Sequence, residues 1–404
     1  MRFVYFAPAD IDLPRVDRQC IVSFCAALAR SGVDLELVGL RIKTMPEEPQ
    51  AEHPLSLYPI EVRFPTRLVR VPVTQTSPGW WVAVNRLVVH SVYAFAEVMR
   101  GRRQPLCLFT KTYSTALALL LGRRIARRPP VVVFEAHVPP RNAVQRWVLR
   151  HVDRVVANTH ALAGELADAW DIPSERILGT HQGVDLELID SQRLTRSEAR
   201  SRLGISEERS LVVYTGKIYE GYGEVEYLLE VAQRALGDER FLFLLVGGRH
   251  DHVARLRDRC ARDGLANVVM TGFVPPTEVP AYQFAADVLV LYYPSGLALN
   301  AYRSPGKLFE YMASGRPIVS VDLPVLREVL TDECASFVEA DSPEALWSAI
   351  QELVDAPERA ERMGSAALER VRDFTWDRRA TRIMNFVSAA RDWEMACEPA
   401  PNQR

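Results

Sequence analysis

Residues 304–321 read SPGKLFEYMASGRPIVSV and carry the strongest structural signals in the chain. Ser304 is a favoured N-cap residue and Pro305 a favoured first helical residue, so the segment predicts a helix that begins there. Gly315 is typical of a helix end, and the apolar run that follows Pro317 predicts a strand. Because the first N–H groups of a helix have no partner within it, the start of this helix is a candidate anion site.

Lys307 and Glu310 lie three residues apart in this segment and therefore share one face of the predicted helix. In that arrangement an ammonium group can contact a phosphate while a carboxylate accepts hydrogen bonds from a ribose diol. Taken alone, the two residues fit an ordinary surface ion pair equally well.

Short apolar runs alternate with segments of helical period on both sides of this stretch. The expected strands are residues 2–7, 34–40, 105–110, 131–136, 154–159, 211–216, 241–248, 267–273, 287–293, 316–321 and 335–340. The expected helices are residues 16–30, 80–100, 114–126, 142–151, 160–170, 224–236, 252–263, 305–314, 343–354 and 357–372. Such alternation is typical of parallel sheets covered by helices on both faces. The predicted fold class is α/β, with two doubly wound, Rossmann-like parallel-sheet domains that face a cleft.

The length also indicates two domains, since 404 residues exceed the roughly 250–300 at which a single core stops growing. The alternation pauses in a charged segment, residues 183–210. We therefore place an N-terminal domain at residues 1–190 and a C-terminal domain at residues 205–375. Doubly wound sheets bind ligands beyond the carboxyl ends of their strands, so a ligand is expected between the domains.

The composition is that of a globular protein, with 48% hydrophobic and 25% charged residues. Its charge is uneven, because residues 1–185 hold 23 Lys and Arg against 17 Asp and Glu while the remainder is acidic. The basic half is expected to meet an anionic partner, although the net charge of −2 does not favour nucleic acid.

The six cysteines are scattered without a C-x2-C pair, which indicates neither a zinc site nor a disulfide framework and favours the reduced cytosol. No secretion signal is expected from the opening MRFVYFAPAD. Polar residues interrupt the apolar stretch 80–99, so a soluble or surface-attached protein is expected.

The pattern S-P-x-K-L-F-E-Y-M-A-x-G-x-P in residues 304–317 resembles the donor-binding helix of the family 4 glycosyltransferases, retaining enzymes of the GT-B fold. Further matches follow the order of that family, with G-V-D at residues 183–185, G-F-V at 272–274 and A-D-V at 286–288. Residues 374–386 resemble the terminal helix that crosses back to the first domain, so a crossover helix is expected at residues 376–397.

The resemblance implies three catalytic residues. Glu310 resembles the glutamate that holds the nucleotide ribose, and Lys217 stands where the family has an arginine that contacts the donor diphosphate. His137 resembles the histidine that faces the donor sugar. A lone histidine more often has a structural role, but the place of His137 at the carboxyl end of an expected strand favours the functional one. The implied donor-binding residues are Gly216, Gly247, Gly272, Phe273, Val274, Tyr302, Ser304, Pro305, Lys307 and Leu308.

Three positions depart from the family pattern. Tyr302 stands where the paired-glutamate signature has its first carboxylate, and Tyr222 replaces a second lysine that clamps the diphosphate. Lys307 is the candidate to supply that missing charge. PADIDLPRVDRQ follows the first strand in place of a glycine-rich loop. These changes leave the donor sugar and base open.

The resemblance implies front-face transfer, in which the acceptor hydroxyl enters beside the leaving diphosphate and the diphosphate helps to take its proton. Catalysis then rests on positioning and on charge stabilisation by Lys217, Lys307 and the helix start. No metal and no cofactor other than the nucleotide-sugar substrate is expected. The strings Asp10-Ile11-Asp12 and His250-Asp251-His252 are interpreted as solvated loop residues, not metal ligands.

The acceptor is expected to be a glycan or lipid-linked molecule in cell-surface polysaccharide or glycolipid synthesis, with the enzyme cytoplasmic or on the inner face of the plasma membrane. The Trp-led apolar segment 80–99 lies among arginines at 100–103 and 123–128, which suits an anionic membrane surface. A buried helix flanked by solvated arginines fits the same residues equally well.

Two other functions remain open. A nucleotide-sugar epimerase of the same fold would release a free sugar, and a non-catalytic partner subunit would keep only the nucleotide pocket or an interface. A two-domain dehydrogenase is disfavoured because no G-x-G-x-x-G follows any expected strand.

Overall fold

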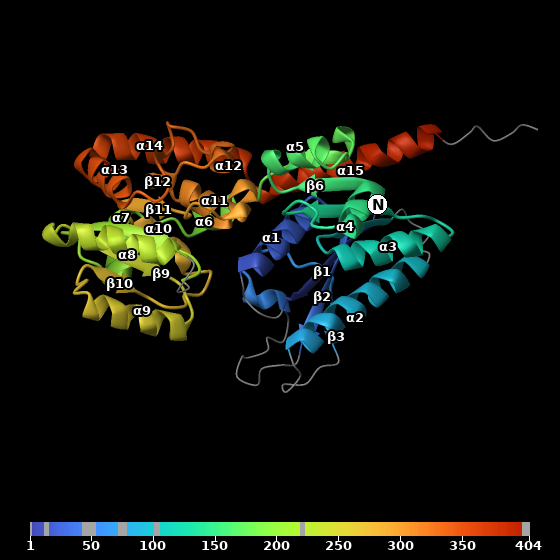
Figure 1. Ribbon diagram of the computed structural model, residues 1–404, viewed down its shortest axis with the longest axis horizontal. Coiled ribbons are helices and arrows are strands. Elements are labelled where there is room, and N and C mark those ends of the chain that lie inside the picture. Colours follow the sequence, from blue (N-terminus) through green and yellow to red (C-terminus); the bar gives the residue numbers. More distant parts are fainter. Residues whose placement is uncertain are drawn as a thin grey trace, which may run out of the picture. The chain divides into compact units, whose positions relative to one another are not determined.

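The computed structural model describes residues 2–11, 16–42, 54–71, 79–100, 106–218 and 223–397. The chain forms two compact units, one from Met1–Gln182 with Trp376–Arg404 and the other from Gly183–Thr375. Each unit contains one parallel sheet flanked by helices (Figure 1). The predicted α/β fold class is confirmed.

The sheet of the first unit has seven strands in the order β3-β2-β1-β4-β5-β6-β7. The strands are β1 Arg2–Asp10, β2 Asp34–Ile42, β3 Thr66–Val71, β4 Leu106–Thr110, β5 Val131–Ala136, β6 Arg154–Ala157 and β7 Ile177–Gly179. Chain order reverses between the central strands β1 and β4, which pair in parallel with Arg2 opposite Leu106. Doubly wound sheets bind ligands beyond the carboxyl ends of the strands at such a reversal.

The helices of the first unit are α1 Val16–Arg30, α2 Gly79–Met99, α3 Tyr113–Ile125, α4 Ala143–His151, α5 His160–Asp168 and α15 Trp376–Cys397. The helix α15 packs against α1, and its buried Trp376, Ala380 and Ile383 join the core formed with β1 and β2. On a different side of the sheet α2 packs against α3, and α3 packs against α4 (Figure 1). The last helix therefore completes the first unit, as the resemblance implies.

The sheet of the second unit has six strands in the order β10-β9-β8-β11-β12-β13. The strands are β8 Ser210–Thr215, β9 Phe241–Val246, β10 Val268–Met270, β11 Val288–Leu291, β12 Ile318–Val321 and β13 Ser336–Val338. The helices are α6 Leu186–Ser191, α7 Arg196–Leu203, α8 Glu224–Arg234, α9 His250–Arg262, α10 Val279–Ala285, α11 Gly306–Ser314, α12 Pro324–Arg327, α13 Pro343–Asp355 and α14 Pro357–Arg370. Here the reversal of chain order lies between β8 and β11.

The second unit begins at Gly183, upstream of the boundary predicted at residues 190–205. The backbone N–H of Val184 donates to the Phe374 carbonyl at 3.0 Å, and Arg193 donates to the Ala313 carbonyl at 2.9 Å. Arg200 is fully buried and donates to the Ala285 carbonyl at 3.0 Å. The charged segment therefore folds onto the second unit, because its arginines find carbonyl partners there.

Candidate donor site at the carboxyl edge of the second sheet

Three of the predicted glycines meet where β8, β9 and β10 end. The Gly216 N–H donates to the Val246 carbonyl at 2.9 Å, and the Gly247 N–H donates to the Gly272 carbonyl at 3.0 Å. A Cβ atom on Gly247 would lie only 2.2 Å from the Gly216 carbonyl oxygen, and the φ of Gly247 is +116°. Gly247 therefore permits a close backbone approach that a residue with a side chain cannot make.

Replacing Gly247 by Ala is expected to lower the free energy of unfolding by about 2–4 kcal/mol and to disrupt the site, because steric overlap adds to backbone strain. The matched control is Gly264→Ala, since Gly264 also has a positive φ of +69° but has open space around its Cβ position. Urea unfolding of both variants measures the difference. Equal losses in the two variants would show that the close approach has no energetic consequence.

The helix α11 begins at Gly306, one residue after the predicted start. Pro305 is the N-cap residue with extended backbone, and no side chain caps the helix. The predicted capping role of Ser304 is therefore wrong, because Ser304 lies one residue too far from the first turn. The Leu308 N–H bonds to the Pro305 carbonyl at 3.1 Å. The anion site at the start of α11 stays a prediction.

Lys307, in the first turn of α11, lies beside the loop that follows β8. Its Nζ would be 3.3 Å from a Cβ on Gly216 and is 3.9 Å from the centre of the Tyr214 ring. Lys217 follows Gly216 directly and is exposed. The structure therefore brings Lys307 to the backbone of the β8 loop that also carries Lys217, and the supply of the missing charge by Lys307 stays a prediction.

Glu224, the first residue of α8, links this lysine to a second cation. It accepts a hydrogen bond from the Tyr214 hydroxyl at 2.5 Å and pairs with Arg303 at 3.3 Å and with Lys307 at 3.5 Å. The Arg303 guanidinium also lies 4.2 Å from the centre of the Tyr293 ring. Burial lowers the pKa of the Lys307 ammonium, and the Glu224 carboxylate opposes that effect. The cluster thus places two cations, which share one carboxylate, beside tyrosines at the ends of β8 and β11.

Glu310 lies on α11 one turn after Lys307 and is held by α10. Gln283 donates to Glu310 Oε2 at 3.2 Å and also reaches the Thr215 hydroxyl at 3.4 Å, at the end of β8. Burial raises the pKa of the Glu310 carboxyl, while Gln283 and Lys307 oppose that rise. A carboxylate with one weak amide partner in this position retains lone pairs that can accept hydrogen bonds from a ligand diol.

The remaining predicted donor-binding residues have different surroundings. Leu308 is buried in the core of the second unit, so its side chain is structural. Val274 packs against the same core from a partly buried position, whereas Phe273 is 65% exposed beside Gly272. Tyr302 ends a short 3₁₀ helix just before α11. Tyr222 lies outside the described residues.

His137 is the predicted catalytic residue of the first unit and follows β5 directly. Its Nδ1 is 3.4 Å from the Asn158 amide nitrogen, and its Nε2 is 3.7 Å from Glu135 Oε2. The His137 side chain is 38% exposed, whereas Glu135 is buried. The imidazole therefore stands at the carboxyl edge of the first sheet with both ring nitrogens near polar groups.

Glu135, the buried neighbour of His137, is itself held by hydrogen bonds. It accepts hydrogen bonds from the Tyr5 hydroxyl at 3.0 Å and from Arg379 of α15 at 2.8 Å. Arg379 also donates to the His181 carbonyl at 2.8 Å. Burial alone would raise the pKa of the Glu135 carboxyl, but Arg379 and His137 hold that pKa well below its usual range. The buried Glu135 carboxylate therefore stays ionised, and its hydrogen bonds fix its position beside the His137 ring.

The two metal-like strings have other partners among the described residues. Asp10 pairs with Arg86 at 3.8 Å, and Asp12 lies outside the described residues. His250, Asp251 and His252 begin α9, where Asp251 pairs with Arg249 at 3.1 Å. The interpretation of both strings as solvated loops is therefore wrong, because Asp10 is buried at the end of β1 and residues 250–252 form the first turn of α9, where only His250 and Asp251 are exposed.

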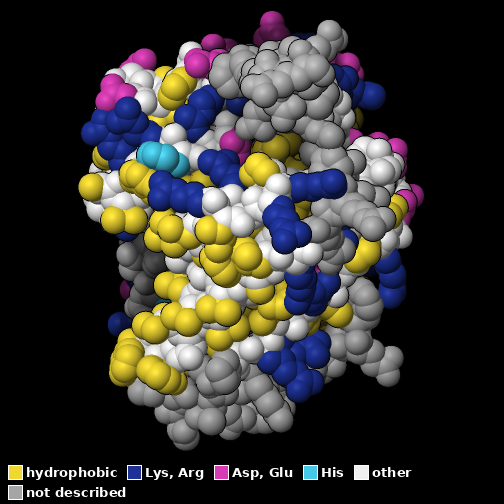
Figure 2. Space-filling view, turned by 90° about the vertical axis from the view of Figure 1, so that its right-hand side faces the viewer, with side chains coloured by type: hydrophobic (Ala, Val, Ile, Leu, Met, Phe, Trp, Pro, Cys, Tyr) yellow, Lys and Arg dark blue, Asp and Glu magenta, His cyan; other side chains and the backbone are white. Residues whose placement is uncertain are grey.

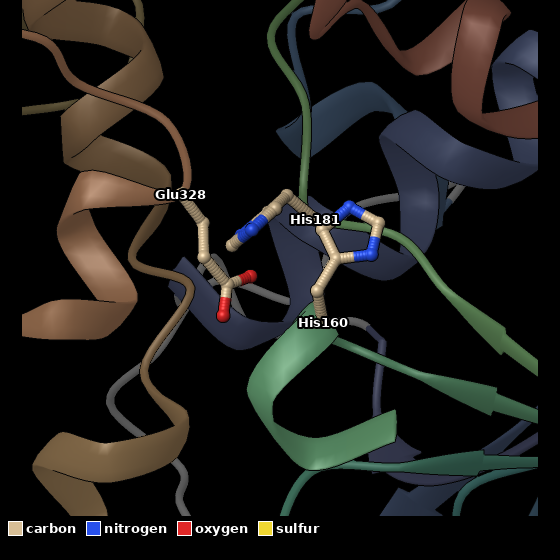
Figure 3. A group of neighbouring side chains, drawn as sticks. All are labelled: His160, His181 and Glu328. Carbon is tan, nitrogen blue, oxygen red and sulfur yellow. The ribbon is translucent and has the colours of Figure 1, made fainter. Parts of the chain in front are cut away.

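Two other histidines lie together in the first unit. The ring centres of His160, at the start of α5, and His181, after β7, are 5.7 Å apart (Figure 3). Glu328, also drawn, belongs to the second unit. Two imidazoles fall short of the four ligands of a structural zinc site, and absence of a metal stays a prediction.

The sequence did not point to Arg303, Glu224, Gln283, Glu135 or Arg379. Arg303 and Glu224 are far apart in the chain and have no fixed spacing that marks them as partners. Glu135 stands two residues before His137, at the end of a strand, and strand alternation continued by one residue would place their side chains on the same face. That spacing is a signal that could have linked Glu135 to the histidine.

Family comparisons cover both units. The description "Glycosyltransferase Family 4" matches residues 19–188, and "Glycosyl transferases group 1" matches residues 209–356. The second range includes the glycines, Lys217, Lys307 and Glu310, and the first includes His137.

Curated relatives carry the name D-inositol 3-phosphate glycosyltransferase. The protein from Streptomyces griseus is 30% identical over 263 residues, which cover 59% of this chain and 54% of the relative. The protein from Nocardioides is 28% identical over 265 residues, which cover 61% and 56%. The chain thus spans little more than half the length of the relatives it matches.

Solved structures match over nearly the whole chain. Sucrose-phosphate synthase from Thermosynechococcus elongatus has a TM-score of 0.71 at 19% identity, covering 98% of this chain and 99% of that one. HepE from Anabaena, in complex with UDP, has a TM-score of 0.69 at 16% identity, covering 96% and 100%. At these identities the likeness shows a shared fold.

Proposed function

Because the chain belongs to the family 4 glycosyltransferases and has the GT-B fold, we propose that it transfers a hexosyl unit from a nucleotide-sugar donor to a glycan or lipid-linked acceptor, with retention of anomeric configuration. The proposed setting is the synthesis of cell-surface polysaccharide or glycolipid.

The observation that carries this proposal is the arrangement at the carboxyl edge of the second sheet. Glu310 has lone pairs that can accept hydrogen bonds from a diol, and it lies one helical turn from Lys307. The Lys307 ammonium lies beside Gly216, the residue that precedes Lys217. A ribose and a diphosphate are neighbours within a nucleotide and need these two kinds of group side by side. The strand reversal is also where doubly wound sheets bind nucleotides.

In the proposed reaction the bond between the hexosyl C1 and the donor diphosphate breaks, and a bond forms between C1 and the acceptor oxygen. The acceptor proton passes to the departing diphosphate. Lys217, Lys307 and the N-terminus of α11 stabilise the negative charge that grows on that diphosphate. His137, on the first unit, is proposed to face the donor sugar. Neither a metal nor a further cofactor enters this scheme.

The donor class is tested by thermal unfolding with UDP, GDP, ADP and CMP, because a ligand bound only to the folded state stabilises it by mass action, by about 2.7 kcal/mol at a hundredfold excess over Kd. UDP is the first candidate, since HepE was solved with UDP and with UDP-glucose. Stabilisation by one nucleotide supports the proposal. No stabilisation by any of the four would contradict it.

Replacing Lys217 by Ala is expected to lower kcat/KM about 10- to 100-fold, the worth of one charge-assisted hydrogen bond to the diphosphate. The free energy of unfolding should change by less than about 0.5 kcal/mol, because Lys217 is exposed. Lys217→Arg is the control, since the guanidinium keeps the charge. Unchanged kcat/KM in the alanine variant would remove Lys217 from the site.

Product analysis separates this proposal from its two alternatives. Transfer yields a glycosylated acceptor, whereas an epimerase yields free sugar in the absence of any acceptor. A non-catalytic partner subunit binds the nucleotide without turnover over a panel of donors. The acceptor and the location are also proposals. We place the protein in the cytoplasm, at the inner face of the plasma membrane, where a lipid-linked acceptor would be reached.

A further inference from the structure

The helix α2 leaves one side uncovered. Its exposed apolar side chains include Trp80 at 67%, Val88 at 54% and Val92 at 64% of their full exposure. Trp81, Val84, Val88 and Val92 follow one another at intervals of three or four residues, so they share one side of the helix. We call Trp80, Trp81, Val84, Leu87, Val88 and Val92 the apolar face of α2.

The helix α2 packs directly against α3, whose apolar residues Leu121 and Ile125 are also exposed, at 48% and 62%. Figure 2 shows hydrophobic side chains gathered in a broad band on this side of the first unit. Exposed apolar areas of this kind mark surfaces that meet another apolar phase.

The charged residues of α2 and of the end of α3 are mostly positive. Glu97 is the one acidic residue of α2, and it is buried and paired with Arg100 at 2.7 Å. Arg124 and Arg127, at the end of α3 and just beyond it, are exposed. In Figure 2 dark blue Lys and Arg side chains border the yellow band. An apolar face with a cationic border complements the headgroups and acyl chains of an anionic bilayer.

The opposite side of α2 is built into the protein. His90 is buried and lies 3.0 Å from the Thr115 hydroxyl of α3, and burial lowers its pKa to about 4. A Cβ on Gly122 of α3 would lie 3.2 Å from Val98, which shows how closely the two helices approach. By length and composition α2 could cross a membrane, and with only 22% of its most apolar window buried it is not an ordinary core helix. Crossing would expose His90 and Glu97 to lipid, so α2 fits a helix that lies flat on the surface.

We propose that the apolar face of α2 docks the first unit onto the surface of an anionic phospholipid bilayer. This docking surface would bring the enzyme to a lipid-linked acceptor, and in that respect the inference rests on the proposed function. Binding to the bilayer itself does not depend on that function. A second copy of the chain is the weaker occupant, because a two-fold contact through this face would bring the like-charged arginines of both copies together.

The test is co-sedimentation of the full chain at low salt with vesicles of phosphatidylcholine alone or mixed with phosphatidylglycerol. Binding is expected only to the mixed vesicles. The double variant Val84→Glu/Val88→Glu should bind at least about tenfold less, because charged residues replace apolar ones on the docking face. The matched control is Leu236→Glu/Val269→Glu, which alters exposed apolar residues of the second unit, at 40% and 45%.

A second pair of variants tests the cationic border. Arg124→Glu/Arg127→Glu should lose the preference for phosphatidylglycerol, whereas Arg202→Glu, an exposed arginine of the second unit, should keep it. Failure of the wild-type chain to bind mixed vesicles would overturn the inference, as would equal losses in the variants and their controls. A dimer in solution that Val84→Glu/Val88→Glu dissociates, without vesicle binding by the wild type, would assign the face to a second copy instead.

Thermal stabilisation by UDP separates this inference from the proposed function. The α2 variants should keep the stabilisation of the wild-type chain, because donor-site residues lie in the other unit. If nucleotide binding is absent in every protein while vesicle binding persists, the docking surface stands and the proposed function fails.

Discussion

Replacing Glu310 by Gln is expected to reduce kcat/KM by about 10²- to 10⁴-fold, which corresponds to two charge-assisted hydrogen bonds to a ribose at about 1.5–3 kcal/mol each. The same change should leave the free energy of unfolding unchanged or higher. Burial raises the pKa of the Glu310 carboxyl, so the ionised group costs the folded state free energy that a neutral amide does not. Loss of activity with retained stability is typical of a residue kept for binding.

Because the pKa of Glu310 is raised in the folded state, the difference in stability between wild type and Glu310→Gln depends on pH. Since the folded-state pKa of Glu310 lies above the ordinary 4.5, the cost grows as the pH rises from 4.5 through the folded pKa. Glu310→Gln should therefore gain stability relative to wild type over that range. Glu369→Gln is the control, because the Glu369 side chain is 78% exposed. A strongly destabilised Glu310→Gln variant would indicate that the carboxylate is structural.

Replacing Arg379 by Met is expected to lower the free energy of unfolding at pH 7 by about 3–5 kcal/mol, because it leaves the buried Glu135 carboxylate without its main cation. Arg378→Met is the matched control, since Arg378 is an exposed neighbour on the same helix and should cost less than about 0.5 kcal/mol. Urea unfolding of both variants at pH 7 measures the difference.

The pH dependence of this loss follows from Glu135. Its folded-state pKa lies below the ordinary 4.5, so its stabilising contribution is present above pH 4.5 and disappears as the pH falls through the folded pKa. The difference between wild type and Arg379→Met should therefore shrink in acid. A loss that stays the same from pH 7 to pH 3 would mean that Arg379 stabilises only by packing and by its bond to the His181 carbonyl.

Much of the fold could be predicted from local sequence patterns. The run VDRQCIVSFCAALAR gave the bounds of α1, 16–30, because Ser31 and Gly32 end a clear helical period. The strands β3 and β7 were missed. In TRLVRV of β3, arginines interrupt the apolar residues, so the segment shows no continuous apolar run. The strand β7 has only three residues. The short helices α6 and α7 lie in the charged segment where the sequence predicts the domain boundary. Their contacts with the rest of the second unit form only on folding, so the sequence pattern does not show them.

The donor site was predictable where residues lie close in sequence. Lys307 and Glu310 share a helix, so their proximity follows from helical geometry. The pairing of Glu224 with Arg303 joins residues on α8 and before α11, and it arises only because β8 and β11 are adjacent in the sheet. Sequence spacing does not encode such contacts. The same holds for Arg379, which reaches Glu135 from the last helix of the chain.

The most direct test of the donor site is a thermodynamic cycle measured by calorimetric titration. UDP and 2′,3′-dideoxy-UDP, or the corresponding pair for whichever nucleotide stabilises the chain, are titrated into the wild type and into Glu310→Gln. If Glu310 holds the ribose, removing the hydroxyls should weaken binding to the wild type by about 10²- to 10⁴-fold and change binding to the variant by less than about threefold. Equal weakening in both proteins would contradict the proposed role of Glu310, and with it the account of the site.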